Sequence, residues 1–330
     1  MYTEFDTLSH KEKSCYNQMM LRLERYEVNF KLEGFDGETV KRAFSALVRD
    51  NPQFFWLSGA ANFCTTTMGR VIKDVTVTAE LQRGVQLYAV PSMAQQFDRT
   101  VNSIVQQVRQ IRTVYGQVLA VHNYIIDTTD YVLNAPMCYD AYGCLVNHRA
   151  VCAGYAKAFM LIMRRLGYVC GYARGWGRET GENHAWNFIK LENDFYFIDV
   201  TWDDPTVIGG SRTRDNKSMD FFCLTTEELM KTHRLSSETP VPVCKGTKYN
   251  YYRYNRLYLQ RYSFSELLPI ATAQLKQGKK FTVKFATDYE ADRAFTDLIT
   301  NQMVYKIPGI GNRILYFRKE KHRTLTVENG

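Results

Sequence analysis

Three residues with side chains suited to nucleophilic acyl transfer stand in one stretch of the chain: Cys152, His184 and Asp199. A thiol can attack a carbonyl carbon, an imidazole can move the proton, and a carboxylate can hold the imidazole in one tautomer. Cys152 opens a helical pattern, His184 begins one predicted strand, and Asp199 lies on the next. We therefore predict a cysteine enzyme with Cys152 as nucleophile, His184 as general base and acid, and Asp199 as orienting carboxylate.

The residues after Cys152 have the spacing of one helical face. Apolar or small side chains follow it at steps of three and four, at Ala156, Phe159, Met163 and Leu166. Gly167 fits the C-terminal stop of that helix. At a helix N-terminus, unpaired N–H groups and the helix dipole favour an anion such as a thiolate or the oxyanion of an intermediate. The alternative is that Cys152 is a buried, inert cysteine.

Residues 184–191 and 195–201 are predicted to form a hairpin. If Glu192 and Asn193 make a two-residue turn, Asp199 lies opposite Trp186 and diagonal to His184. Diagonal neighbours on one face of a hairpin are within reach of an Asp–His hydrogen bond. A register slip of one residue would put the two side chains on opposite faces, and a chance pair is the alternative.

Aromatic residues stand beside all three members of this set. Tyr155 lies in the first turn of the predicted helix, Trp186 faces Asp199, and Trp202 follows it. We predict that these three side chains bind substrate in the cleft. Packing in the core is the alternative for each of them.

The residue strings around these positions resemble the bacterial transglutaminase-like superfamily. The similarity is carried by residues 147–156 with Cys-Ala-Gly-Tyr, by 183–187 with His-Ala-Trp, and by 199–205 with Asp-Val-Thr-Trp-Asp-Asp-Pro. Residues 50–56 and 248–252 are similar to segments around that core. The resemblance implies an α+β fold whose papain-like core packs the nucleophile helix against an antiparallel sheet. It also implies the catalytic set Cys152, His184 and Asp199, with no cofactor.

The function implied by the resemblance is acyl transfer or hydrolysis at amide bonds of a peptide or protein, through a thioester. The superfamily also contains members without activity, so a silent peptide-binding module of the same fold is an alternative. The sequence identifies no partner for the oxyanion other than backbone N–H groups. It shows no acidic loop of the calcium-binding type.

A metal site is the alternative of a different class. Cys138, Cys144, His148 and Cys152 would make a Cys₃His set for zinc, but their spacing matches no familiar zinc pattern. We therefore predict no metal ligands.

Composition favours a globular protein, with 45% hydrophobic and 14% aromatic residues among 330. The net charge is +8, and the densest basic cluster, residues 318–323, is interpreted as a solvated edge or strand end and not as a nucleic-acid patch. Eight cysteines without a regular framework or a CxxC pair favour reduced thiols and a cytoplasmic protein. No apolar stretch is long enough for a membrane helix, and the first residues do not resemble a signal peptide, although a trimmed signal would make the protein secreted. Oligomeric state is not predicted.

The pattern of elements divides the chain into three regions. We expect an N-terminal helix and strand domain over residues 1–95, a transglutaminase-like core over 96–250, and a small α/β module over 251–330. The predicted helices cover 14–26, 38–48, 93–115, 118–126, 267–275 and 291–298. The further predicted strands cover 71–77, 85–90, 280–286, 314–318 and 324–327.

Overall fold

The computed structural model describes residues 3–69, 71–205, 217–237 and 240–330. Helices and strands are mixed along the chain, so the predicted α+β class is confirmed. The helices are α1 (His10–Leu23), α2 (Gly37–Asp50), α3 (Val90–Arg109), α4 (Val114–Thr128), α5 (Ala141–Leu145), α6 (Cys152–Arg165), α7 (Val200–Asp203), α8 (Thr226–Leu229), α9 (Tyr251–Tyr254), α10 (Phe264–Leu275) and α11 (Asp288–Phe295). The strands are β1 (Asn29–Glu33), β2 (Leu57–Met68), β3 (Val71–Leu81), β4 (Asp130–Tyr131), β5 (Arg149–Ala150), β6 (Cys170–Gly177), β7 (Asn183–Leu191), β8 (Asp194–Ile198), β9 (His233–Leu235), β10 (Tyr258–Leu259), β11 (Lys280–Phe285), β12 (Ile314–Lys319) and β13 (Thr324–Asn329).

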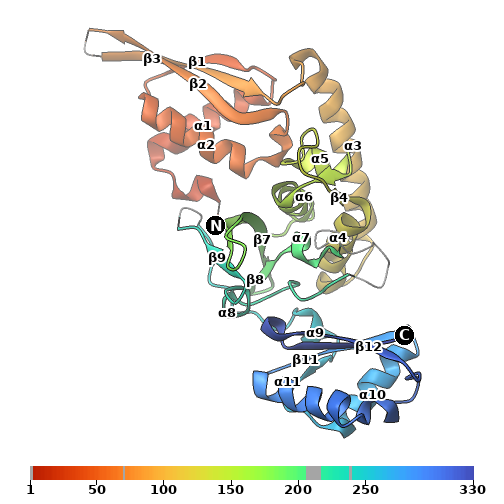
Figure 1. Ribbon diagram of the computed structural model, residues 1–330. Coiled ribbons are helices and arrows are strands. Elements are labelled where there is room, and N and C mark those ends of the chain that lie inside the picture. The colour runs from red at the N-terminus through yellow and green to blue at the C-terminus, as the bar shows by residue number, and fades with distance from the viewer. Residues whose placement is uncertain (1–2, 70, 206–216, 238–239) are drawn as a thin grey trace.

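The N-terminal region pairs α1 and α2 with an antiparallel sheet of order β1-β3-β2 (Figure 1). Helix α2 ends at Asp50, as the following Asn51-Pro52 predicts. The strand predicted over 85–90 is wrong, because a short 3₁₀ turn (Leu87–Ala89) leads there into α3, with Pro91 in the first turn of the helix. Strands β1 and β2 were absent from the prediction. β2 is exposed along most of its length and therefore lacks the alternation that marks a half-buried strand.

The central region surrounds α6, which contacts α4, α5 and the antiparallel sheet of order β8-β7-β6-β9. A helix against an antiparallel sheet is the core that the sequence resemblance implies. The helix is buried on several sides because most of its residues are apolar, from Ala158 to Met163. Buried side chains of the N-terminal and central regions form one continuous core. The boundary at residue 95 stays a prediction.

The C-terminal region has its own hydrophobic core beneath a sheet of order β10-β11-β13-β12. Strands β11, β13 and β12 are antiparallel, and β10 runs parallel to β11. Figure 1 shows α10 and α11 on the side of this sheet that faces away from the central region.

The basic cluster at residues 318–323 joins the C-terminal region to the central one. The Lys319 ammonium lies 2.6 Å from a carboxylate oxygen of Asp220, which is only 2% exposed. Lys321 pairs with Glu179, and the His322 ring packs at 4.6 Å from that of Phe221. The cluster thus lies at the end of β12, as one of the two interpretations has it, with Lys319 and Lys321 exposed, and these three residues also make contacts between the two regions.

All eight cysteines are free thiols in the structure. Within the described residues, helices that combine the length and the apolar character needed to cross a membrane are absent.

Candidate active site

Cys152 is the first residue of α6, as the apolar spacing predicts. The preceding Val151 has an extended backbone and no side-chain oxygen, so the helix begins without a side-chain cap. The thiol is partly exposed, in contrast to the buried residues of the next turns. Gly154 is required in this turn, since a Cβ there would lie 2.5 Å from the carbonyl oxygen of Cys138. Cys152 therefore sits at an open helix N-terminus.

The predicted hairpin and its register are confirmed. Strands β7 and β8 are antiparallel, Leu191 faces Asp194, and Glu192 begins the two-residue turn with a φ of 54°. The second strand ends at Ile198 and not at Thr201 as predicted. It ends there because Asp199 caps a short helix, α7: its Oδ1 accepts the backbone N–H groups of Thr201 and Trp202, at 3.0 and 3.1 Å.

The structure brings Cys152, His184 and Asp199 together. Nε2 of His184 lies 2.6 Å from Oδ2 of Asp199, and both side chains are buried. The imidazole also lies close enough to the thiol of Cys152 for the two groups to interact. Because Nε2 is engaged by Asp199, Nδ1 is the ring nitrogen left for the thiol. The order thiol, imidazole, carboxylate is the one that nucleophilic catalysis requires.

The charges of this set favour an imidazolium. Burial alone would lower the pKa of His184, but the carboxylate of Asp199 and, after it, the neighbouring Cys152 raise that pKa to about 10. Burial alone would likewise raise the pKa of Asp199, but the imidazoles of His184 and His233 hold it well below its usual range. Near neutral pH, His184 is therefore charged and can give a proton to a leaving group.

His233 is a member of the site that the sequence did not reveal. It lies on β9, opposite Gly177 of β6, and its Nε2 is 3.0 Å from the same Oδ2 of Asp199 that binds His184. Its Nδ1 lies 2.8 Å from the hydroxyl of Thr232. Burial lowers the pKa of His233 despite the neighbouring carboxylate, so its ring is neutral and acts as a hydrogen-bond donor to Asp199.

Two tryptophans enclose the imidazole of His184. The ring of Trp202 stacks on it at 5.0 Å, and that of Trp186 at 5.7 Å. Trp202 is partly exposed, whereas Trp186 is only 1% exposed. Tyr155 is fully buried, with its hydroxyl 2.8 Å from a carboxylate oxygen of Asp204. In the structure, Trp186 and Tyr155 thus lie in the core and not at the cleft wall where we expected them, and only Trp202 has the exposure that a substrate contact needs.

The acidic residues at the end of the hairpin also anchor the site to its surroundings. Asp203 is buried, with one carboxylate oxygen 3.1 Å from Nε2 of His122 on α4 and the other accepting the backbone N–H of Phe221. Burial raises the pKa of Asp203 to about 6. Each of the three carboxylates therefore holds a different partner in place. Asp199 binds the two imidazoles, Asp203 binds α4 through His122, and Asp204 binds α6 through Tyr155.

The four residues considered as the alternative zinc site do not come together in the structure. Among the described residues, three potential metal ligands do lie together, but they are His184, Asp199 and His233. The group does not include Cys138, Cys144, His148 or Cys152. In the set that does assemble, both nitrogens lie at hydrogen-bond distance from one oxygen. A tetrahedral zinc ion at about 2.0–2.1 Å from each ligand would hold the ligand atoms roughly 3.3 Å apart. The nitrogens of His184 and His233 lie closer than this to the Asp199 oxygen, at 2.6 and 3.0 Å, which fits hydrogen bonds.

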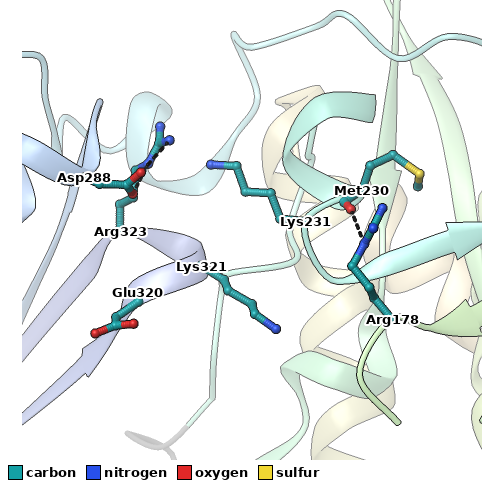
Figure 2. Close-up of a pocket in the computed structure, with 7 residues that line it drawn as sticks. All are labelled: Arg178, Met230, Lys231, Asp288, Glu320, Lys321 and Arg323. Atoms are coloured by element: carbon teal, nitrogen blue, oxygen red, sulfur yellow. Dashed lines mark hydrogen bonds and ion pairs between the residues drawn. The ribbon is translucent and has the colours of Figure 1, made fainter. Parts of the chain in front are cut away.

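A cavity of about 470 Å³ lies apart from this site, where the C-terminal region meets β6 and α8. Figure 2 shows Lys231 and Lys321 extending into it from opposite sides, while Arg323 is turned toward Asp288 and Arg178 toward the carbonyl oxygen of Met230. The lining is mostly charged and includes none of Cys152, His184 and Asp199, so this cavity belongs to the contact between the regions and not to the acyl chemistry.

The family comparison agrees with the geometry. Residues 102–200, which include Cys152, His184 and Asp199, match the profile described as Transglutaminase-like superfamily. The chain therefore contains a transglutaminase-like domain over this stretch.

Individual relatives are similar over limited parts of the chain. The kyphoscoliosis peptidases of Mus musculus and Homo sapiens are each 34% identical to it over 92 residues, 25% of this chain and 13% of theirs. Among solved structures, a transglutaminase matches with a TM-score of 0.31 and 15% identity, covering 56% of this chain and 52% of its own. A protein of Cytophaga hutchinsonii classed as a candidate cysteine protease matches with a TM-score of 0.30 and 14% identity, covering 46% of this chain and 65% of its own.

Proposed function

We propose that this protein breaks or exchanges amide bonds of a peptide or protein through a thioester on Cys152. The observation that carries the proposal is the His184 imidazole, which is hydrogen-bonded to the carboxylate of Asp199 and interacts with the thiol of Cys152. A silent binding module of the same fold would not need this arrangement of three groups, since peptide binding uses none of them as proton carriers.

The proposed first step is acylation. The sulfur of Cys152 forms a bond to the amide carbon, and the carbonyl electron pair moves to the oxygen, which becomes an oxyanion. When the intermediate collapses, the C–N bond breaks and His184 gives its proton to the departing amine. Asp199 holds the imidazole in place through both steps and stabilises its charged form.

The proposed second step releases the acyl group. The now neutral His184 takes a proton from a water molecule or an amine as that molecule attacks the thioester carbon. The C–S bond of the resulting intermediate then breaks, which releases the acyl product and restores the thiolate–imidazolium pair. We favour water as acceptor, because no sequence feature marks a lysine-binding tunnel. The names of the curated relatives, which are peptidases, support the same choice.

Hydrolysis and transfer can be separated with one substrate. We expect that a glutamine-containing peptide incubated with the protein yields mainly hydrolysis products, both with and without a primary amine at millimolar concentration, and that chelators do not change the rate. Mass spectrometry of the products measures the ratio. Amine incorporation that outpaces hydrolysis would make the protein a cross-linking enzyme and contradict our choice of acceptor.

The dependence of kcat/KM on pH in the alkaline range should follow the protonation of His184. Because its pKa is raised to about 10, the imidazolium needed to protonate an amine leaving group is present below that pH and lost above it. We expect kcat/KM for an amide to decline above about pH 10. A p-nitrophenyl ester, whose leaving group needs no proton, serves as control and should keep its rate. A decline of the amide rate that begins near pH 7 would contradict the ion-pair assignment.

A further inference from the structure

The proposed mechanism leaves one need open, which is the stabilisation of the oxyanion. The backbone N–H of Cys152 is one donor, because it belongs to the attacking residue at the uncapped start of α6. Oxyanion sites normally combine such an N–H group with a second donor. A second donor must lie close both to the sulfur and to this N–H group.

Tyr131 occupies such a position. It lies on β4, which pairs in parallel with β5 so that Tyr131 is opposite Ala150, two residues before the nucleophile. Two backbone hydrogen bonds fix this pairing, from Asp130 to the carbonyl oxygen of His148 at 2.8 Å and from Val132 to that of Ala150 at 3.0 Å. The backbone around Tyr131 is therefore tied to the segment that leads into α6.

The Tyr131 side chain points toward the start of α6. Its ring lies 6.2 Å from the ring of Tyr155, in the first turn of that helix, and its hydroxyl lies close enough to Cys152 for the thiol and the backbone N–H of that residue to affect its pKa. The tyrosine is only partly buried, so a substrate carbonyl can approach the same place from solvent.

We infer that the Tyr131 hydroxyl is the second donor to the oxyanion of the tetrahedral intermediate, beside the backbone N–H of Cys152. This inference rests on the proposed function. As the Cys152 sulfur bonds to the carbonyl carbon, the new oxyanion enters between the two groups, and each donates one hydrogen bond to it without transferring its proton. Burial, and after it the charge of Cys152, raises the pKa of Tyr131 to about 12, so the hydroxyl keeps its proton over the working pH range.

The test compares two reactions of the same thiol in the Tyr131→Phe protein. Acylation by p-nitrophenyl acetate, followed as p-nitrophenolate release in a single turnover, passes through an oxyanion. Alkylation by iodoacetamide is a displacement at a saturated carbon and does not. We expect acylation to slow by about 10²-fold or more, the typical cost of one oxyanion donor, while the alkylation rate stays the same.

Tyr139→Phe is the matched control, because Tyr139 is a nearby exposed tyrosine and should leave both rates unchanged. Unfolding midpoints in urea show that both variants are folded. Equal acylation rates in wild type and Tyr131→Phe would overturn the inference and leave the proposed function standing. Slower alkylation would also overturn it, because Tyr131 would then act on the thiol. A wild-type protein that is alkylated at Cys152 but never acylated would overturn both.

Discussion

We expect replacement of Cys152 by alanine to abolish acyl chemistry, with a loss of at least about 10⁴-fold in kcat, because Cys152 is the thiol that lies beside His184 and Asp199. The first turn of α6 is partly open at this residue, so we expect the variant to fold with little change in its free energy of unfolding. Hydrolysis of an amide substrate and mass spectrometry of the trapped acyl-protein measure the loss.

The matched control for this prediction is Cys64→Ala. Cys64 is the exposed cysteine on β2, while the six others apart from Cys152 are buried. We expect iodoacetamide to label Cys152 ahead of the more exposed Cys64, because Cys152 has both a helix N-terminus and His184 beside it. The Cys64→Ala protein should keep full activity. Faster labelling of Cys64 would show that exposure alone governs reactivity and would contradict an activated nucleophile.

Asp199→Asn should have the next largest effect, a loss of about 10²–10⁴-fold in kcat/KM. The carboxylate accepts four hydrogen bonds: Oδ1 takes the N–H groups of Thr201 and Trp202, and Oδ2 takes His184 and His233. An asparagine has one oxygen and one NH₂ group. It can therefore cap α7 or accept from the two imidazoles, but it cannot do both.

The pH profile of this variant gives a readout that simple misfolding would not. Asp199 is the main group that raises the pKa of His184, so its neutralisation should move the alkaline limb of the amide profile from about pH 10 toward the ordinary range of histidine. His122 provides the control, because its partner Asp203 lies on α7, the short helix that Asp199 caps. The His122→Gln substitution removes a buried hydrogen bond outside the site. We expect this control to lower stability without moving the limb. An unshifted limb in Asp199→Asn would contradict the orienting role.

The parts of the site that were predictable from the sequence are those set by local periodicity. The steps of three and four after Cys152 fix a helix, and the two-residue turn at Glu192 fixes which residues face each other. A helix start and a hairpin register together place Cys152, His184 and Asp199. The end of the second strand was predicted too late, because the pattern does not show that Asp199 accepts the next N–H groups itself and so begins a helix.

The parts that were missed depend on contacts between distant segments. His233 reaches Asp199 from 34 positions further along the chain, through the pairing of β9 with β6, and a lone histidine on a three-residue strand gives no periodic signal. Tyr131 lies on a strand of two residues, which is too short to show any alternation. Strand β2 was missed for the opposite reason, since its twelve residues are mostly exposed on both faces.

The buried carboxylate of Asp220 bears on whether the central region can be produced without the C-terminal region. It is held between the hydroxyl of Tyr252, at 2.7 Å, and the ammonium of Lys319, both of which lie outside residues 96–250. A fragment cut at residue 250 would remove both of these partners and, among the described residues, would keep only the hydroxyl of Ser218, at 3.0 Å, on this carboxylate. A boundary drawn from sequence similarity is therefore not a safe place to truncate the protein, and the longer chain is the proper unit for expression and assay.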